Sequence, residues 1–180
     1  MLLISAEQLV ARLPVYRSLV GLVAVSESLY GVAHSDPYLS CARPAPSATS
    51  LASVAALAAK LNCGALVVGL PFAAAGLEQA ERDAERQQRA LAERQQRALA
   101  ALLREPALAR SGLLACAFVP AKQHTAACVA QLHRDNLLWD QTGLEELGKQ
   151  GEARDASVLA AVSLQLFLDQ HCGGWANTFG

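Results

Sequence analysis

The sequence lacks a strong net charge and a long apolar run. Its 180 residues contain 15 lysines and arginines against 16 aspartates and glutamates, a formal net charge of -1. Without a global positive field, contact with nucleic acid requires a local basic patch. No run of eighteen apolar residues is present, which argues against a transmembrane helix. Because 53% of the residues are hydrophobic, the length suits one globular domain with a substantial core.

Clustered metal ligands are also absent from the sequence. The cysteines show no CxxC or CxxxH spacing, and the histidines are scattered. His171 and Cys172 are adjacent, but neighbouring side chains point in different directions in a helix or a strand. The sequence therefore predicts no metal site, no cofactor, and buried free thiols in a reducing compartment. These thiols are Cys41, Cys63, Cys116, Cys128 and Cys172.

Two common catalytic motifs are missing as well. The GxSxG elbow does not occur, and His34, Ser35 and Asp36 are consecutive residues of a predicted strand that cannot converge on one atom. The segment 69–76 lacks the GxxxxGK(S/T) pattern of a phosphate loop, and Pro71 removes an amide donor there. Neither a serine hydrolase nor a P-loop protein is indicated.

Residues 1–18 are predicted to form an N-terminal helical extension. A short helix that packs on the domain and ends before Pro14 fits the pattern. Arg12 and Arg17 against the single acid Glu7 also give a weakly amphipathic, organelle-targeting character. We therefore expect mitochondrial localisation, with the cytoplasm or a plastid as alternatives.

Three strands are predicted in the first half of the chain. Leu19–Val25 is a β-branched apolar run, and Ser28–Ser35 follows a tight turn, so the two form a hairpin. The apolar segment 64–71 is bounded by glycine and proline, which is typical of a buried parallel strand.

Between these strands we predict a loop and a helix. Residues 41–50 contain Pro44 and Pro46 and are expected to form the loop. Ser47, Thr49 or Ser50 caps the helix that follows over 51–62.

One long amphipathic helix is predicted over 77–103. It contains a tandem repeat, because ERQQRALA occurs at 85–92 and again at 93–100. Leucines and alanines fall on one side and arginines on the other, with acids interleaved among the arginines. The basic face is either a solvated surface or a docking surface for a protein or RNA partner. Its arginines are Arg82, Arg86, Arg89, Arg97 and Arg104.

The second half of the chain alternates in the same way. Gly112–Pro120 is predicted to be a strand, 124–135 a helix, and 155–170 a helix capped by Asp155. The tail 171–180 has no periodicity and carries Trp175 and Phe179, which we expect to contact a partner. The order of elements predicts an α/β domain whose sheet begins with antiparallel strands and continues with parallel ones.

Three segments carry a resemblance to a known family. YGVAHSDP at 30–37, ALVVGLPFAAAG at 65–76 and LAAVSLQLFLDQ at 159–170 resemble the landmark segments of the YqgF/RuvX family, the Holliday-junction-resolvase-like branch of the RNase H fold. The resemblance spans roughly 20–170, so it implies an RNase H-like domain over 19–170. It also implies nuclease ancestry and a link to ribosomal RNA processing.

Such nucleases hold divalent metal with a few carboxylates, because hard cations need carboxylate oxygens at fixed positions. By resemblance, the family's acid positions fall on Ala24, Ala121 and Ser157, none of which has a carboxylate. A rival alignment supplies Asp140 in place of Ala121, and Asp155 lies two residues from Ser157. A shift of two residues turns a helical side chain by about 200°, so Asp155 is expected to point away.

The leading hypothesis is therefore a catalytically inactive RNase H-like domain. It would act as a structural or interaction subunit of a larger assembly, with a mitochondrial ribosome or another mitochondrial complex as the expected host. The alternative is a nucleic-acid-binding module that uses the arginine face, or a residual metal-dependent nuclease that uses Asp140 and Asp155 on structured RNA or branched DNA.

Overall fold

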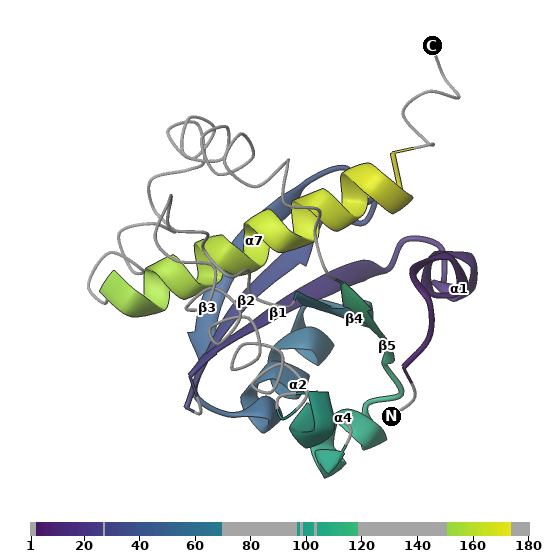
Figure 1. The fold of residues 1–180 in the computed structure, drawn as a ribbon. Coiled ribbons are helices and arrows are strands. Elements are labelled where there is room, and N and C mark those ends of the chain that lie inside the picture. The colour runs from purple at the N-terminus through teal and green to yellow at the C-terminus, as the bar shows by residue number, and fades with distance from the viewer. Residues whose placement is uncertain are drawn as a thin grey trace, which may run out of the picture.

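Five strands form one mixed sheet with helices on both faces (Figure 1). The computed structural model describes residues 3–26, 28–69, 97, 99–102, 104–118 and 151–173. The strands are β1 (Ser18–Ser26), β2 (Leu29–Ser35), β3 (Ala42–Ala48), β4 (Cys63–Gly69) and β5 (Leu114–Phe118). The helices are α1 (Ala6–Arg12), α2 (Leu51–Lys60), α4 (Pro106–Arg110) and α7 (Gly151–His171).

The strand order is β3-β2-β1-β4-β5. β1 pairs antiparallel with β2, and β2 antiparallel with β3. β4 lies parallel to both β1 and β5. The predicted α/β class and the mixed sheet are confirmed: antiparallel strands come first in the chain and parallel strands follow.

The prediction of a loop at 41–50 is wrong over most of its length. Residues 42–48 form β3, which pairs with β2 and contains Pro44 and Pro46. Proline lacks an amide hydrogen and is tolerated at the border of a sheet, where that donor has no partner strand. β3 is the border strand of the described sheet, so its prolines are compatible with pairing on one side only.

The two predicted helices that flank the sheet are present, with one change. α2 begins after Ser50, whose side-chain oxygen accepts a hydrogen bond from the Ser53 amide, as expected for a cap. α7 begins at Gly151, earlier than predicted. Asp155 therefore lies inside the helix rather than at its cap, and that part of the prediction is wrong.

The sheet separates two cores. α7 covers one face and lies mainly over β2, with β3 and β1 beside it, while α2 and α4 cover the other face (Figure 1). Under α7 the core contains Phe167, which packs edge-to-face on Phe118 of β5. Under α2 it contains Val54 and Leu66. Because side chains alternate along a strand, neighbouring residues of β1 and β4 enter different cores.

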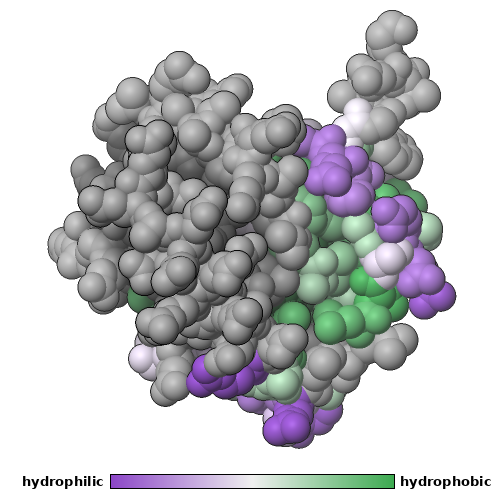
Figure 2. Space-filling view, in the orientation of Figure 1, coloured by the Kyte–Doolittle hydropathy of each residue, from purple (hydrophilic) through white to green (hydrophobic). Residues whose placement is uncertain are grey.

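The N-terminal segment packs alongside β5, the border strand of the described sheet opposite β3. The Ile4 amide donates to the Ala115 carbonyl oxygen, and Leu3 bridges the same residue in parallel. Ser5 caps α1 through the Gln8 amide, and Leu9 is fully buried in the core under α7. The helix ends before Pro14, as predicted. Figure 2 shows apolar surface in green between α1 and the C-terminal end of α7.

Most of the predicted long helix, all of the predicted helix at 124–135 and residues 174–180 of the tail lie outside the described residues, while His171 at the start of the tail is the last residue of α7. The described residues from 97 to 104 are helical, with Leu102 buried and Arg97 and Arg104 exposed. This stretch therefore has a buried side and an exposed side, as predicted for the amphipathic helix. None of the described helices is long and apolar enough to cross a membrane.

Candidate functional site

Ala24, to which the resemblance assigns the first acid position, lies near the carboxyl ends of the parallel strands. Ala24 pairs with Tyr30, which packs against the core under α2. The neighbouring pair is Val23 with Gly31, and Val23 belongs to the core under α7. Ala24 therefore faces away from α7, and the residue of β1 that faces α7 at this level is Val23. Neither side chain carries an oxygen.

Ser157 lies on the side of α7 that contacts the sheet. Its side chain is fully buried, and its hydroxyl oxygen has no hydrogen-bond partner. Its backbone lies next to Gly31 of β2. The structure therefore brings Ser157 close to the Val23–Gly31 pair but not to the side chain of Ala24.

Glycine allows α7 to lie directly on the strands at this end. A Cβ atom added to Gly31 would lie only 1.9 Å from the carbonyl oxygen of Ala156. A Cβ atom added to Gly69, at the end of β4, would lie 2.2 Å from the hydroxyl oxygen of Ser163. Backbone and small side chains thus fill the space between Gly31 and α7, and no room is left there for a pair of hydrated cations. We call this contact, formed by Val23, Gly31, Gly69, Ala156, Ser157 and Ser163, the closed end.

Among the described residues, no group of three or more histidines, cysteines, aspartates or glutamates is placed to hold a metal ion. Ser163 is a second serine of the closed end whose buried hydroxyl has no partner. Buried unpartnered hydroxyls cost free energy, so each serine is a weak point of an otherwise apolar contact.

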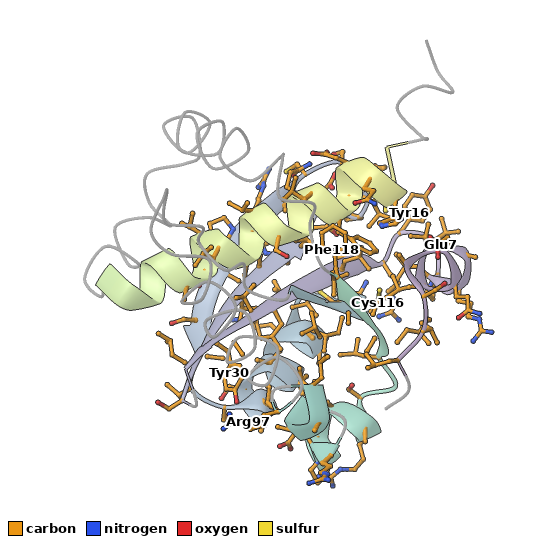
Figure 3. The ribbon with its side chains drawn as sticks, in the orientation of Figure 1. Glu7, Tyr16, Tyr30, Arg97, Cys116 and Phe118 are labelled. Carbon is orange, nitrogen blue, oxygen red and sulfur yellow. The ribbon has the colours of Figure 1, made fainter. Side chains whose placement is uncertain are left out.

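The remaining predicted site residues fall into two groups. Arg97 and Arg104 are exposed on the described helical stretch, and Arg97 is labelled in Figure 3. The others lie outside the described residues: Ala121, Asp140, Arg82, Arg86, Arg89, Trp175 and Phe179.

The opposite end of the sheet carries a surface that the sequence reasoning missed. Val15 and Tyr16, before β1, are 79% and 69% exposed, and Tyr38, between β2 and β3, is 75% exposed. The two tyrosine rings meet edge-to-face with their centroids 6.3 Å apart. Figure 3 shows Tyr16 at one end of the sheet and Tyr30, beside the closed end, at the other. We call Val15, Tyr16, Arg17, Tyr38 and Asn62 the tyrosine edge.

The loops of the tyrosine edge hold unusual backbone conformations. Tyr16, Leu39 and Asn62 have φ angles of 61°, 57° and 55°, and they are the only non-glycine residues with positive φ in the described part of the chain. Asparagine tolerates this region, whereas tyrosine and leucine rarely adopt it. Tyr16 stands third in a turn that the Arg17 amide closes on the Pro14 carbonyl, at a position that favours glycine.

Asp36 organises the loop that presents Tyr38. Its carboxylate accepts hydrogen bonds from the Ser40 amide at 2.7 Å, the Ser40 hydroxyl at 2.7 Å and the Cys41 amide at 3.0 Å. Burial alone would raise the pKa of Asp36, but these donors more than offset it and hold the pKa below its ordinary value. The charged carboxylate of Asp36 therefore holds this loop in place.

One histidine and two cysteines of the described chain also have shifted pKa values. Burial lowers the pKa of His34, and the charge of Arg43 lowers it further, so the imidazole is neutral at neutral pH. Burial raises the pKa of Cys63 and of Cys172 to about 11. Both are free thiols, as is buried Cys116, so these cysteines are unreactive side chains of the core.

No protein-family model matches the sequence, and no curated protein sequence matches it either. The likeness to the YqgF/RuvX family therefore rests on the three segments quoted above.

Proposed function

We propose that this chain is a catalytically inactive RNase H-like domain of the YqgF/RuvX type. It serves as a structural or interaction subunit of a larger assembly, and its host is a mitochondrial ribosome or another mitochondrial complex. The arrangement of the sheet, antiparallel strands followed by parallel ones, is compatible with that fold.

One observation carries the proposal of inactivity. At the closed end the main chain of α7 lies against Gly31, and the matched position Ser157 is a fully buried hydroxyl. A two-metal nuclease needs the reverse, an open site with several carboxylates that water and a phosphodiester can reach. The residues of the closed end pack against one another, and none of them is a carboxylate that could bind a metal ion.

The role as a subunit is supported by the tyrosine edge. Three large side chains more than two-thirds exposed, two of them tyrosines, are the composition found at binding surfaces rather than at ordinary solvent-facing loops. Their loops are also held in costly conformations, which proteins retain where function requires them.

The test is sedimentation of the tagged chain from native extract, followed by mass spectrometry of the fractions in which it migrates. The proposal predicts migration with a large particle whose proteins are mitochondrial. The same sedimentation after ribonuclease treatment shows whether RNA holds the chain there, and the tag alone is the control. Migration as a free monomer would overturn the proposal.

A further inference from the structure

We propose that the tyrosine edge binds single-stranded RNA. The inference rests on the proposed function, because RNA is the nucleic acid that surrounds a subunit of a ribosome. It assigns RNA contact to the amino ends of the parallel strands, away from the closed end, in place of the arginine face predicted over 82–104.

The tyrosine rings provide the stacking surface. Tyr16 and Tyr38 come from different loops, yet their rings meet edge-to-face, so each ring supports the other while most of its area stays exposed. Unpaired bases stack on exposed aromatic rings without regard to sequence, because every base has a flat π surface. Val15, which is 79% exposed, extends the apolar area beside them.

Polar donors lie next to the rings. The Arg17 guanidinium donates to the side-chain oxygen of Asn62, an exposed neutral partner. The pairing orients the guanidinium and leaves its charge intact, since an amide oxygen does not neutralise it. A guanidinium held in this way suits a phosphate group, with which it forms paired hydrogen bonds.

Positive charge gathers around this end of the sheet. Five exposed cations stand where elements begin or end there, and none forms an ion pair with another described residue. They are Arg12 at the end of α1, Arg17 before β1, Arg43 at the start of β3, Lys60 at the end of α2 and Arg110 at the end of α4. The whole chain has a formal net charge of -1, so this is a local concentration of the kind that nucleic-acid contact requires.

The carboxylates of the same end are already engaged. Asp36 accepts hydrogen bonds from Ser40 and Cys41, and Asp169 accepts one from Gln165. None of these hydrogen bonds involves one of the five cations, so the cations have no direct carboxylate partner among the described residues, while the charges of the acids offset part of the local positive field.

The rigidity of the loops also favours this role. Tyr16 and Leu39 hold left-handed backbone conformations, and the Asp36 carboxylate fixes the turn that carries Tyr38. Rings that are already positioned lose little conformational entropy when a base stacks on them.

The experiment measures fluorescence anisotropy of a fluorescein-labelled single-stranded oligouridine RNA titrated with the full chain over a range of salt concentrations. The double variant Tyr16→Ser, Tyr38→Ser is expected to weaken binding by about tenfold or more, because each stacked base contributes substantially to affinity. The variant Tyr16→Phe, Tyr38→Phe keeps both rings and is expected to bind as the parent does. Arg17→Gln is expected to reduce the salt dependence by about 0.7 in the slope of log K against log salt.

A matched control separates this surface from others. Leu159→Ser removes an exposed apolar side chain from α7 and is expected to leave binding unchanged. Circular dichroism melting of each variant shows that it is folded. Duplex RNA and DNA of the same sequence serve as competitors, and the single-stranded RNA is expected to bind most tightly.

The proposal is overturned if the Tyr→Ser variant binds as tightly as the parent. It is also overturned if binding is lost only when Arg86, Arg89 and Arg97 are replaced, or if the parent does not bind the RNA. In that last case, sedimentation with a large particle would leave the subunit role intact and assign the tyrosine edge to a protein contact. RNA binding without such sedimentation would instead contradict the subunit role.

Discussion

The two ends of the sheet differ in whether their side chains are buried or exposed. At the closed end, glycines let α7 lie on the strands, and serines and alanines are buried between them. At the tyrosine edge, large side chains stand in solvent on strained loops. The fold is therefore closely packed at one end and exposes apolar area at the other.

This difference matters for where function is sought. In a sheet with parallel strands, the carboxyl ends are where ligands usually bind. Among the described residues, Gly31 and Ala156 pack closely at that end, and the exposed tyrosines lie at the amino ends.

The largest effect is expected from placing a carboxylate at the closed end. Ser157→Asp would bury a charge with no partner, which costs about 4 kcal/mol of the free energy of unfolding. Urea denaturation with and without Mg²⁺ measures the free energy of unfolding of the variant. We expect Mg²⁺ to leave it unchanged, and a Mg²⁺-dependent gain in stability would show that a cation site remains.

The next effect is expected from filling the glycine contact. Gly31→Ala would set a Cβ atom against the Ala156 carbonyl oxygen, and we expect a loss of about 3 kcal/mol because main chain must move. Gly112→Ala is the matched control. Gly112 has a φ angle of 70° and open space around it, so only backbone strain, about 1 kcal/mol, is expected. Equal losses for the two variants would contradict the close packing of α7.

A smaller effect is expected in the loop that presents Tyr38 of the tyrosine edge. Asp36→Ala removes the acceptor of three hydrogen bonds and is expected to cost about 2 kcal/mol at neutral pH. Because the folded protein lowers the pKa of Asp36, its contribution is present above the unfolded pKa of about 3.9 and is lost as the pH falls through the folded value. Denaturation of parent and variant across this range should therefore converge at low pH, and a constant difference would contradict the assignment.

The smallest effects are expected to have opposite signs at the two ends. Ser163→Ala removes a buried hydroxyl without a partner and is expected to stabilise the protein by about 0.5–1 kcal/mol. Ser40→Ala removes a hydroxyl that donates to Asp36 and is expected to destabilise it by about as much. Chemical denaturation of both variants checks the pair, and a destabilised Ser163→Ala would mean that its hydroxyl has a partner.

Much of the sheet could be predicted because its strands have simple patterns. The β-branched run before Val25 and the apolar segment ending at Gly69 are strands for reasons that lie within each segment. β3 was missed because Pro44 and Pro46 are typical of loops, and only the strand order shows that they lie at the border of the sheet.

The tyrosine edge could not be predicted because exposure depends on the tertiary structure. Its one local signal is a large residue in a turn, as at Tyr16 after Pro14 and at Tyr38 after Pro37. The absence of carboxylates at the matched positions was visible in the sequence. That Ala24 and Ser157 lie on different sides of β1 depends on the register with Tyr30, which the sequence does not reveal.

The most direct test of the central claim is a cleavage assay with the purified chain on structured RNA and branched DNA in the presence of Mg²⁺ or Mn²⁺. Asp155→Asn and Asp140→Asn are run beside the parent, because these are the carboxylates that a rival alignment would use. We predict that the parent cleaves neither substrate and that both variants behave identically to it. Metal-dependent cleavage by the parent that Asp155→Asn abolishes would contradict the account and favour the nuclease alternative.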